Sequence, residues 1–99
     1  MWYAICGRDA AESLADRQAA RPGHLERISE LHKQGRLLLA GPMPAIDSRD
    51  PGPAGYHGSL IIAEFESLDE ARSWAEADPY RAAGVYAELE VWPFLRVLP

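Results

Sequence analysis

The chain has 99 residues, of which 47% are hydrophobic and 25% charged, and its formal net charge is -5 at pH 7. This composition is typical of a folded globular protein and excludes a disordered one. The basic residues form no cluster with aromatic residues, so we expect neither nucleic acid nor anionic membrane as a partner. A single cysteine excludes an intrachain disulfide framework and a CxxC metal or redox site.

The apolar runs are too short to span a bilayer, and the first residues enter a strand pattern without the features of a secretory leader. We therefore expect one cytoplasmic domain over residues 1–99. A domain of this length has too little chain to cover both faces of a sheet, and this favours a homodimer.

The N-terminal part of the chain is predicted to form a strand, helices and a second strand. Residues 2–6 are an apolar run that we expect to be a strand buried on both faces. Residues 11–20 have high helix propensity, and Pro22 is interpreted as the first residue of a new helix that ends at Gly35. Residues 36–41 follow as the second strand.

The next segment, residues 42–58, is rich in proline and glycine and is predicted to be a long loop lying over a pocket. Residues 59–65 have the strongest strand pattern of the chain. Residues 67–77 begin with a capping box and are predicted to be a helix. Asp78 and Pro79 then open a short helical turn.

The last predicted element is a strand over residues 86–94, in which Pro93 indicates either the end of the strand or an edge position. The order of elements, β-α-β-β-α-β, defines an α+β fold of the ferredoxin-like kind. In this fold a four-stranded antiparallel sheet carries both helices on one face. We expect a second copy of the chain to cover the other face, which gives a homodimer with its sheets packed together.

His24 and Asp78 are the candidate acid/base residues. If the helix begins at Pro22, His24 lies in its first turn, near free N–H groups, and shares an inward face with Ile28 and Leu31. An aspartate before a proline caps a helix, and its second oxygen is free to orient an imidazole. The alternative is structural, with a histidine bonded to a carbonyl and an aspartate that only caps.

Three further residues are candidate ligand contacts. Arg21 is expected to hold a carboxylate or phenolate with two hydrogen bonds, the alternative being a structural ion pair. Ser59 begins a strand near the long loop and can donate to a ligand oxygen, but no nucleophile elbow surrounds it. Tyr80 either lines the pocket or packs in the core. The spacing of the histidines predicts no metal site, and we expect no cofactor.

At these positions the chain resembles the YciI-like proteins. The segments that carry the resemblance are residues 21–25, 35–38, 40–45, 54–55, 58–59, 62–68, 77–80 and 82–86. The resemblance extends over essentially the whole chain and implies a dimeric α+β barrel, in which two ferredoxin-like monomers pair. It also implies a site centred on His24 and Asp78, with Arg21, Ser59 and Tyr80 as ligand contacts.

A few relatives of this family eliminate chloride from chlorinated hydroxyquinols. The resemblance therefore implies lyase or isomerase chemistry on a small anionic or phenolic molecule. In this interpretation His24 moves a proton and Asp78 orients its ring. Two alternatives stay open: a module that binds a small ligand without turnover, and a dimeric domain in which both residues are purely structural.

Overall fold

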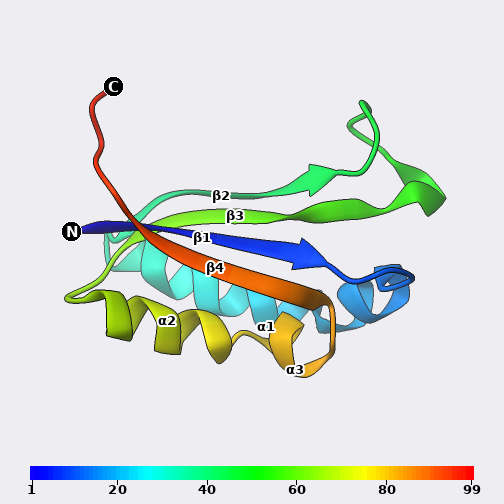
Figure 1. The fold of residues 1–99 in the computed structure, drawn as a ribbon, viewed down its shortest axis with the longest axis horizontal. Coiled ribbons are helices and arrows are strands. Elements are labelled where there is room, and N and C mark those ends of the chain that lie inside the picture. The colour runs from blue at the N-terminus through cyan, green and yellow to red at the C-terminus, as the bar shows by residue number, and fades with distance from the viewer.

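The computed structural model describes residues 1–99 and shows a four-stranded antiparallel sheet with the helices on one face (Figure 1). The elements in chain order are β1 (Trp2–Asp9), α1 (Leu14–Lys33), β2 (Leu37–Pro44), the 3-10 helix η1 (Gly52–Ala54), β3 (Tyr56–Glu64), α2 (Leu68–Glu76), α3 (Pro79–Ala82) and β4 (Tyr86–Phe94). The strand order β2-β3-β1-β4 is that of a ferredoxin-like fold. The predicted fold class is confirmed, as is the edge position of β4.

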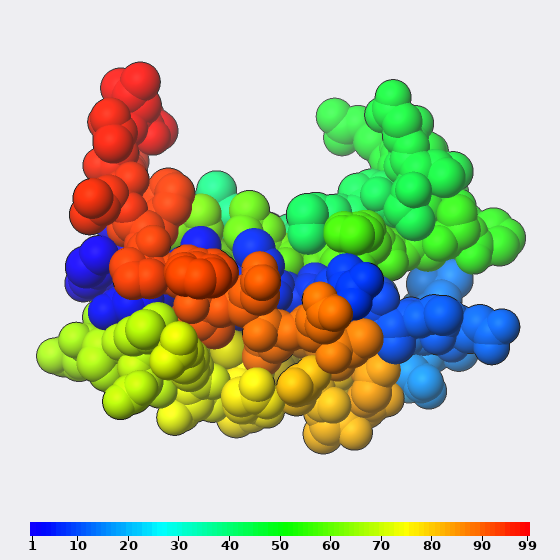
Figure 2. Space-filling model, in the orientation of Figure 1, coloured from blue at the N-terminus to red at the C-terminus, as the bar shows by residue number.

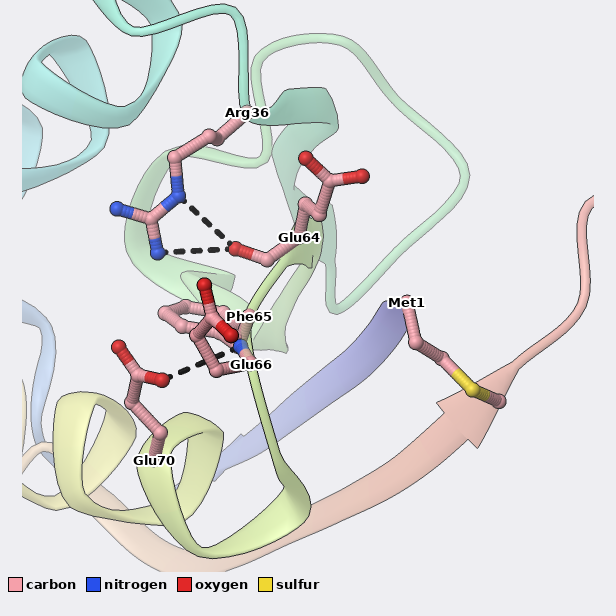
Figure 3. A pocket seen from close by; sticks show the side chains of 6 residues that line it. All are labelled: Met1, Arg36, Glu64, Phe65, Glu66 and Glu70. Carbon is pink, nitrogen blue, oxygen red and sulfur yellow. Dashed lines mark hydrogen bonds between the residues drawn. The ribbon is translucent and has the colours of Figure 1, made fainter.

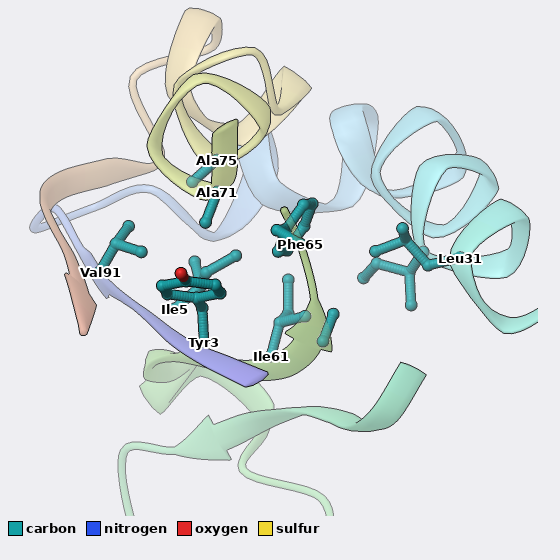
Figure 4. Close-up of a cluster of buried hydrophobic side chains, with 10 residues drawn as sticks. Tyr3, Ile5, Leu31, Ile61, Phe65, Ala71, Ala75 and Val91 are labelled. Atoms are coloured by element: carbon teal, nitrogen blue, oxygen red, sulfur yellow. The ribbon is translucent and has the colours of Figure 1, made fainter. Parts of the chain in front are cut away.

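The main core lies between the sheet and the helices (Figure 4). Tyr3 and Ile5 of β1 and Ile61 of β3 point toward the helices because alternate residues of a strand share one face. Helix α2 contributes Ala71 and Ala75, whose small side chains allow it to lie close to the strands. This packing fixes one face of the sheet and leaves the other uncovered.

The uncovered face of the sheet carries several apolar side chains. In β1 the residues Trp2, Ala4 and Cys6 face this side and are only partly buried, so the prediction of a strand buried on both faces is wrong for the isolated chain. Leu39 and Trp92 are also on this face and are 45% and 61% exposed. The segment after β2 and the C-terminal tail rise on either side of it (Figure 2).

Helix α1 runs without interruption through Pro22, so the prediction of a new helix beginning there is wrong. Proline has no N–H to donate to the carbonyl of Gln18, one turn earlier. Both residues are exposed, so water can solvate that carbonyl. Buried side chains before and after Pro22, among them Arg17 and His24, stabilise the continuous helix.

Strand β2 extends to Pro44 and β3 begins at Tyr56, so the predicted loop over residues 42–58 shrinks to residues 45–55. Pro42 and Pro44 are compatible with a strand here because β2 is an edge strand. The two prolines are two positions apart, and the missing N–H groups therefore both belong to the side of the strand that has no neighbour.

The starts of the C-terminal helices agree with the prediction. The Ser67 hydroxyl accepts a hydrogen bond from the N–H of Glu70, and α2 begins at the next residue. The Glu70 carboxylate accepts from the N–H of Glu66 rather than from that of Ser67, so the capping box is shifted by one residue. None of the helices has the length and apolar character needed to cross a membrane.

Candidate functional site

A buried polar contact joins helix α1 to the start of α3. His24 Nδ1 lies 2.7 Å from Oδ2 and 3.0 Å from Oδ1 of Asp78. The two residues are 5% and 2% exposed. Their neighbours set this distance, since a Cβ atom on Gly23 would lie only 3.2 Å from Cγ of Pro79. The glycine thus lets α1 approach α3 closely enough for the imidazole to reach the carboxylate.

The hydrogen bonds of Asp78 determine where the proton of His24 lies. Asp78 caps α3 as predicted, because its Oδ1 accepts the N–H of Tyr80 at 2.9 Å. An ionised carboxylate only accepts hydrogen bonds, so His24 Nδ1 must be the donor. His24 Nε2 makes no hydrogen bond within the chain. The neutral ring therefore presents Nε2 as a base that can accept a proton from a bound molecule.

The position of His24 within its helix differs from the prediction. It lies in the interior of the continuous helix α1, far from the first turn, and so it receives no help from the N-terminus of that helix. Its environment is instead made by Asp78 and by the aromatic ring of Tyr80.

Tyr80 holds the imidazole from one side. The two rings are parallel within 10° and their centroids are 3.9 Å apart. Tyr86 meets Tyr80 edge-on, with the centroids 5.4 Å apart. Burial raises the pKa of Tyr80, although the nearby charges of Arg17 and Arg21 oppose the shift, so its phenol stays neutral.

Arg17 is the part of the site that sequence reasoning missed. Its guanidinium donates to Asp9 from Nε at 2.8 Å, and Nη2 donates to Ser59 Oγ at 2.6 Å and to the carbonyl of Gly58 at 3.2 Å. Burial alone would lower the pKa of Arg17, but the hydrogen bond and the charge of Asp9 outweigh it and raise that pKa. Arg17 is therefore a fixed cation that orients the Ser59 hydroxyl.

The signal for Arg17 is present in the sequence as a helical spacing. Arg17, Arg21, His24 and Ile28 follow one another at intervals of four, three and four residues, which is one face of an α-helix. This stripe is visible only when α1 is continuous. The interpretation of Pro22 as a helix start hid it.

Four of the five predicted residues meet at one pocket. The pocket has a volume of about 280 Å³ and lies between α1 and β2. His24, Arg21, Ser59 and Tyr80 are among its lining residues. Asp78 is not, and it contacts the pocket only through the His24 ring.

The pocket favours a negatively charged molecule. The charge of Arg17 is balanced by Asp9, and a protonated His24 would be balanced by Asp78. Arg21 is exposed at the pocket and forms no ion pair. One uncompensated positive charge thus remains for a ligand.

A larger hollow of about 370 Å³ lies where β3 leads into α2 (Figure 3). Its one basic side chain already has a partner, because Arg36 donates to the carbonyl of Glu64, and the N–H of Glu66 donates to the Glu70 carboxylate. It contains no buried acid/base pair. The smaller pocket beside His24 is therefore the better candidate for a functional site.

The fold and the site together define a small ferredoxin-like protein with a buried His–Asp pair beside a pocket of about 280 Å³. A family model described as the YCII-related domain matches residues 1–95, and the chain belongs to this family. It is 59% identical to Protein YciI of Escherichia coli O6:H1 over 97 residues, which are 98% of this chain and 99% of that protein. The predicted family is confirmed.

Two more distant relatives have names that describe small-molecule chemistry. Fusaric acid biosynthesis protein 2 of Gibberella fujikuroi is 28% identical over 94 residues, covering 93% of this chain and 90% of that protein. The other is the structure of 5-chloro-2-hydroxyhydroquinone dehydrochlorinase (TftG) from Burkholderia phenoliruptrix AC1100, in complex with 2,5-dihydroxybenzoquinone. It matches with a TM-score of 0.84 and 28% identity, covering 97% of this chain and 95% of that one.

Proposed function

We propose that this protein is a small acid/base enzyme of the lyase or isomerase type that acts on a small anionic or phenolic molecule. The observation that carries the proposal is the buried bond from His24 Nδ1 to Asp78, which leaves Nε2 unpartnered in a residue that lines a pocket. The similarity to a dehydrochlorinase supports this class of reaction. Neither elimination nor isomerisation of this kind requires a redox step.

In the proposed reaction His24 Nε2 accepts a proton from an O–H or C–H group of the substrate. In an elimination the electron pair of that bond forms a new double bond, and the leaving group departs with its own electron pair. Asp78 stabilises the imidazolium that forms and keeps the ring in position. Such proton transfer contributes about 10²- to 10⁴-fold to a rate.

The other residues of the pocket bind and orient the substrate in this proposal. Arg21 binds the phenolate or carboxylate at the mouth of the pocket, because a guanidinium donates two parallel hydrogen bonds to such a group. Ser59 accepts from Arg17, and its own O–H, which lies near the Tyr86 phenol, is the group that donates to a ligand oxygen in this proposal. Tyr80 forms the wall that holds the imidazole.

The assay that tests this function is chloride release from 5-chloro-2-hydroxyhydroquinone. We expect the unmodified protein to release chloride, and His24→Gln to lower kcat by about 10²- to 10⁴-fold. His32→Gln is the matched control, since His32 is an exposed histidine on the same helix, and it should be fully active. Binding of 2,5-dihydroxybenzoquinone without any turnover would support a binding module instead. Failure of both binding and turnover would refute the proposed substrate class.

We also propose that the protein acts as a homodimer, with the open sheet face as the interface. The support is the apolar surface of that face, including Leu39 and Trp92, and the two segments that rise beside it (Figure 2). A cytoplasmic location and a lack of nucleic-acid partners stay predictions from the sequence.

A further inference from the structure

An irregularity in strand β2 changes which of its side chains face the pocket. Leu37 pairs with Ala63 of β3, and Leu39 pairs with the adjacent Ile62, so Leu38 is an extra residue. A bulge of this kind shifts the alternation of the strand by one position. Every residue of β2 after Leu38 therefore faces the side opposite to the one that regular alternation from Leu37 would give.

The residues paired with β2 show where its side chains point after the bulge. Ala40 is paired with Ile61, which lies in the core beneath the helices, and Pro42 is paired with Ser59, which contacts Arg17 of α1. Residues paired across two strands share a face. Ala40 and Pro42 thus face α1, while Leu39 faces the open side and is 45% exposed.

Ala40 and Pro42, together with Leu37 and Gly41, line the pocket from β2, and Arg21 and Leu25 line it from α1. Ala40 is exposed although it points toward the helix layer, so α1 does not cover it. Without the bulge the larger Leu39 would occupy this side. The free space of the pocket therefore depends on a small side chain at position 40.

We propose that Ala40 sets the size limit of the ligand, with Pro42 closing the same wall. The pocket of about 280 Å³ is at the lower end of ligand-site volumes and fits one flat ring with a negative charge. The ring would lie between Ala40 and the α1 face that carries Arg21 and His24. This inference rests on the proposed function, because it assumes that the pocket beside His24 is the binding site.

The test measures binding of 2,5-dihydroxybenzoquinone by calorimetry to the unmodified protein and to three variants. Ala40→Leu should weaken binding at least tenfold, because the added side chain fills the space of the ring. Ala40→Gly should bind within about twofold of the unmodified protein, because it removes only a methyl group from the pocket wall. A tenfold change in affinity would require a loss of about 1.4 kcal/mol. Leu39→Met is the matched control on the opposite face, and its binding should be unchanged.

A second measurement decides the inference without a ligand. The NMR signals of the His24 ring should shift in Ala40→Leu and stay in place in Leu39→Met, because only the first side chain enters the pocket. Equal binding by Ala40→Leu and the unmodified protein, or unchanged His24 ring signals in Ala40→Leu, would overturn the inference. If the unmodified protein does not bind the quinone, the proposed ligand class is wrong, and the His24 ring signals alone decide the role of Ala40.

Discussion

Arg17 and His24 are buried in the same face of α1, and each contacts a carboxylate from another element. A buried charge without a partner is costly, so the Arg17 guanidinium requires the Asp9 carboxylate, and the Asp78 carboxylate requires the hydrogen bond from His24. Asp78 could be predicted from the sequence because Asp-Pro is a local capping signal. The pair of Arg17 and Asp9 could not, because its hydrogen bonds to β1 and β3 exist only after the strands have assembled.

Removal of Arg17 should therefore cost much more stability than removal of an exposed arginine. We expect Arg17→Ala to lower the free energy of unfolding by about 3–5 kcal/mol, since Asp9 is left buried without its partner. Arg8→Ala is the matched control, because Arg8 and Glu88 form an ion pair with side chains 52% and 64% exposed. Arg8→Ala should lower the free energy of unfolding by at most about 1 kcal/mol. Urea unfolding measures both, and equal losses would contradict the account.

The α1 helix shows how a tertiary environment overrides a local signal. Pro22 predicts a helix start, and the same pattern is observed at Pro79 of α3. At Pro22 the helix continues because Arg17 on one side and Ile28 on the other are buried against the sheet. The continuous helix also shapes the pocket, since Arg17 and His24 both line it from the same helix face.

Replacement of the two prolines by alanine should therefore have different effects on stability. Pro22→Ala restores an N–H within a helix, where proline is about 3 kcal/mol less favourable than alanine. About 1 kcal/mol of this gain is lost, because alanine makes the unfolded chain more flexible and so stabilises the unfolded state. We expect a net gain of roughly 1–2 kcal/mol in the free energy of unfolding. Pro79→Ala should give no gain, because the first residue of a helix needs no N–H donor. A loss of stability in Pro22→Ala, measured by denaturant unfolding, would contradict a continuous α1.

At the scale of the whole molecule, the order and type of the elements could be predicted because the strands are apolar runs and the helices have high helix propensity or a capping signal. The limits of β2 could not, since Pro42 and Pro44 indicate a loop unless the strand is known to lie at an edge. The pocket could not be predicted either. It depends on an extra residue in β2, and a strand register is a property of the assembled sheet.

The open face of the sheet is the basis of the proposed dimer, and a single substitution tests it. Trp92 lies on this face, and Trp92→Glu should convert the dimer to a monomer because it places a charge in the apolar interface. Leu25→Glu is the matched control on the helix side, where Leu25 is 39% exposed, and it should stay dimeric. Sedimentation velocity at micromolar concentration measures both. An unmodified protein that sediments as a monomer would refute the interface.

In the proposed mechanism Asp78 fixes the His24 ring with Nε2 free to accept a proton. Nitrogen-15 NMR of the ring, assigned by comparison with His24→Gln, measures this directly at a pH where the ring is neutral. The geometry predicts a hydrogen on Nδ1 and none on Nε2. In Asp78→Asn, where the amide still caps α3, this preference for Nδ1 should weaken. A hydrogen found on Nε2 in the unmodified protein would contradict the role of His24 as the base.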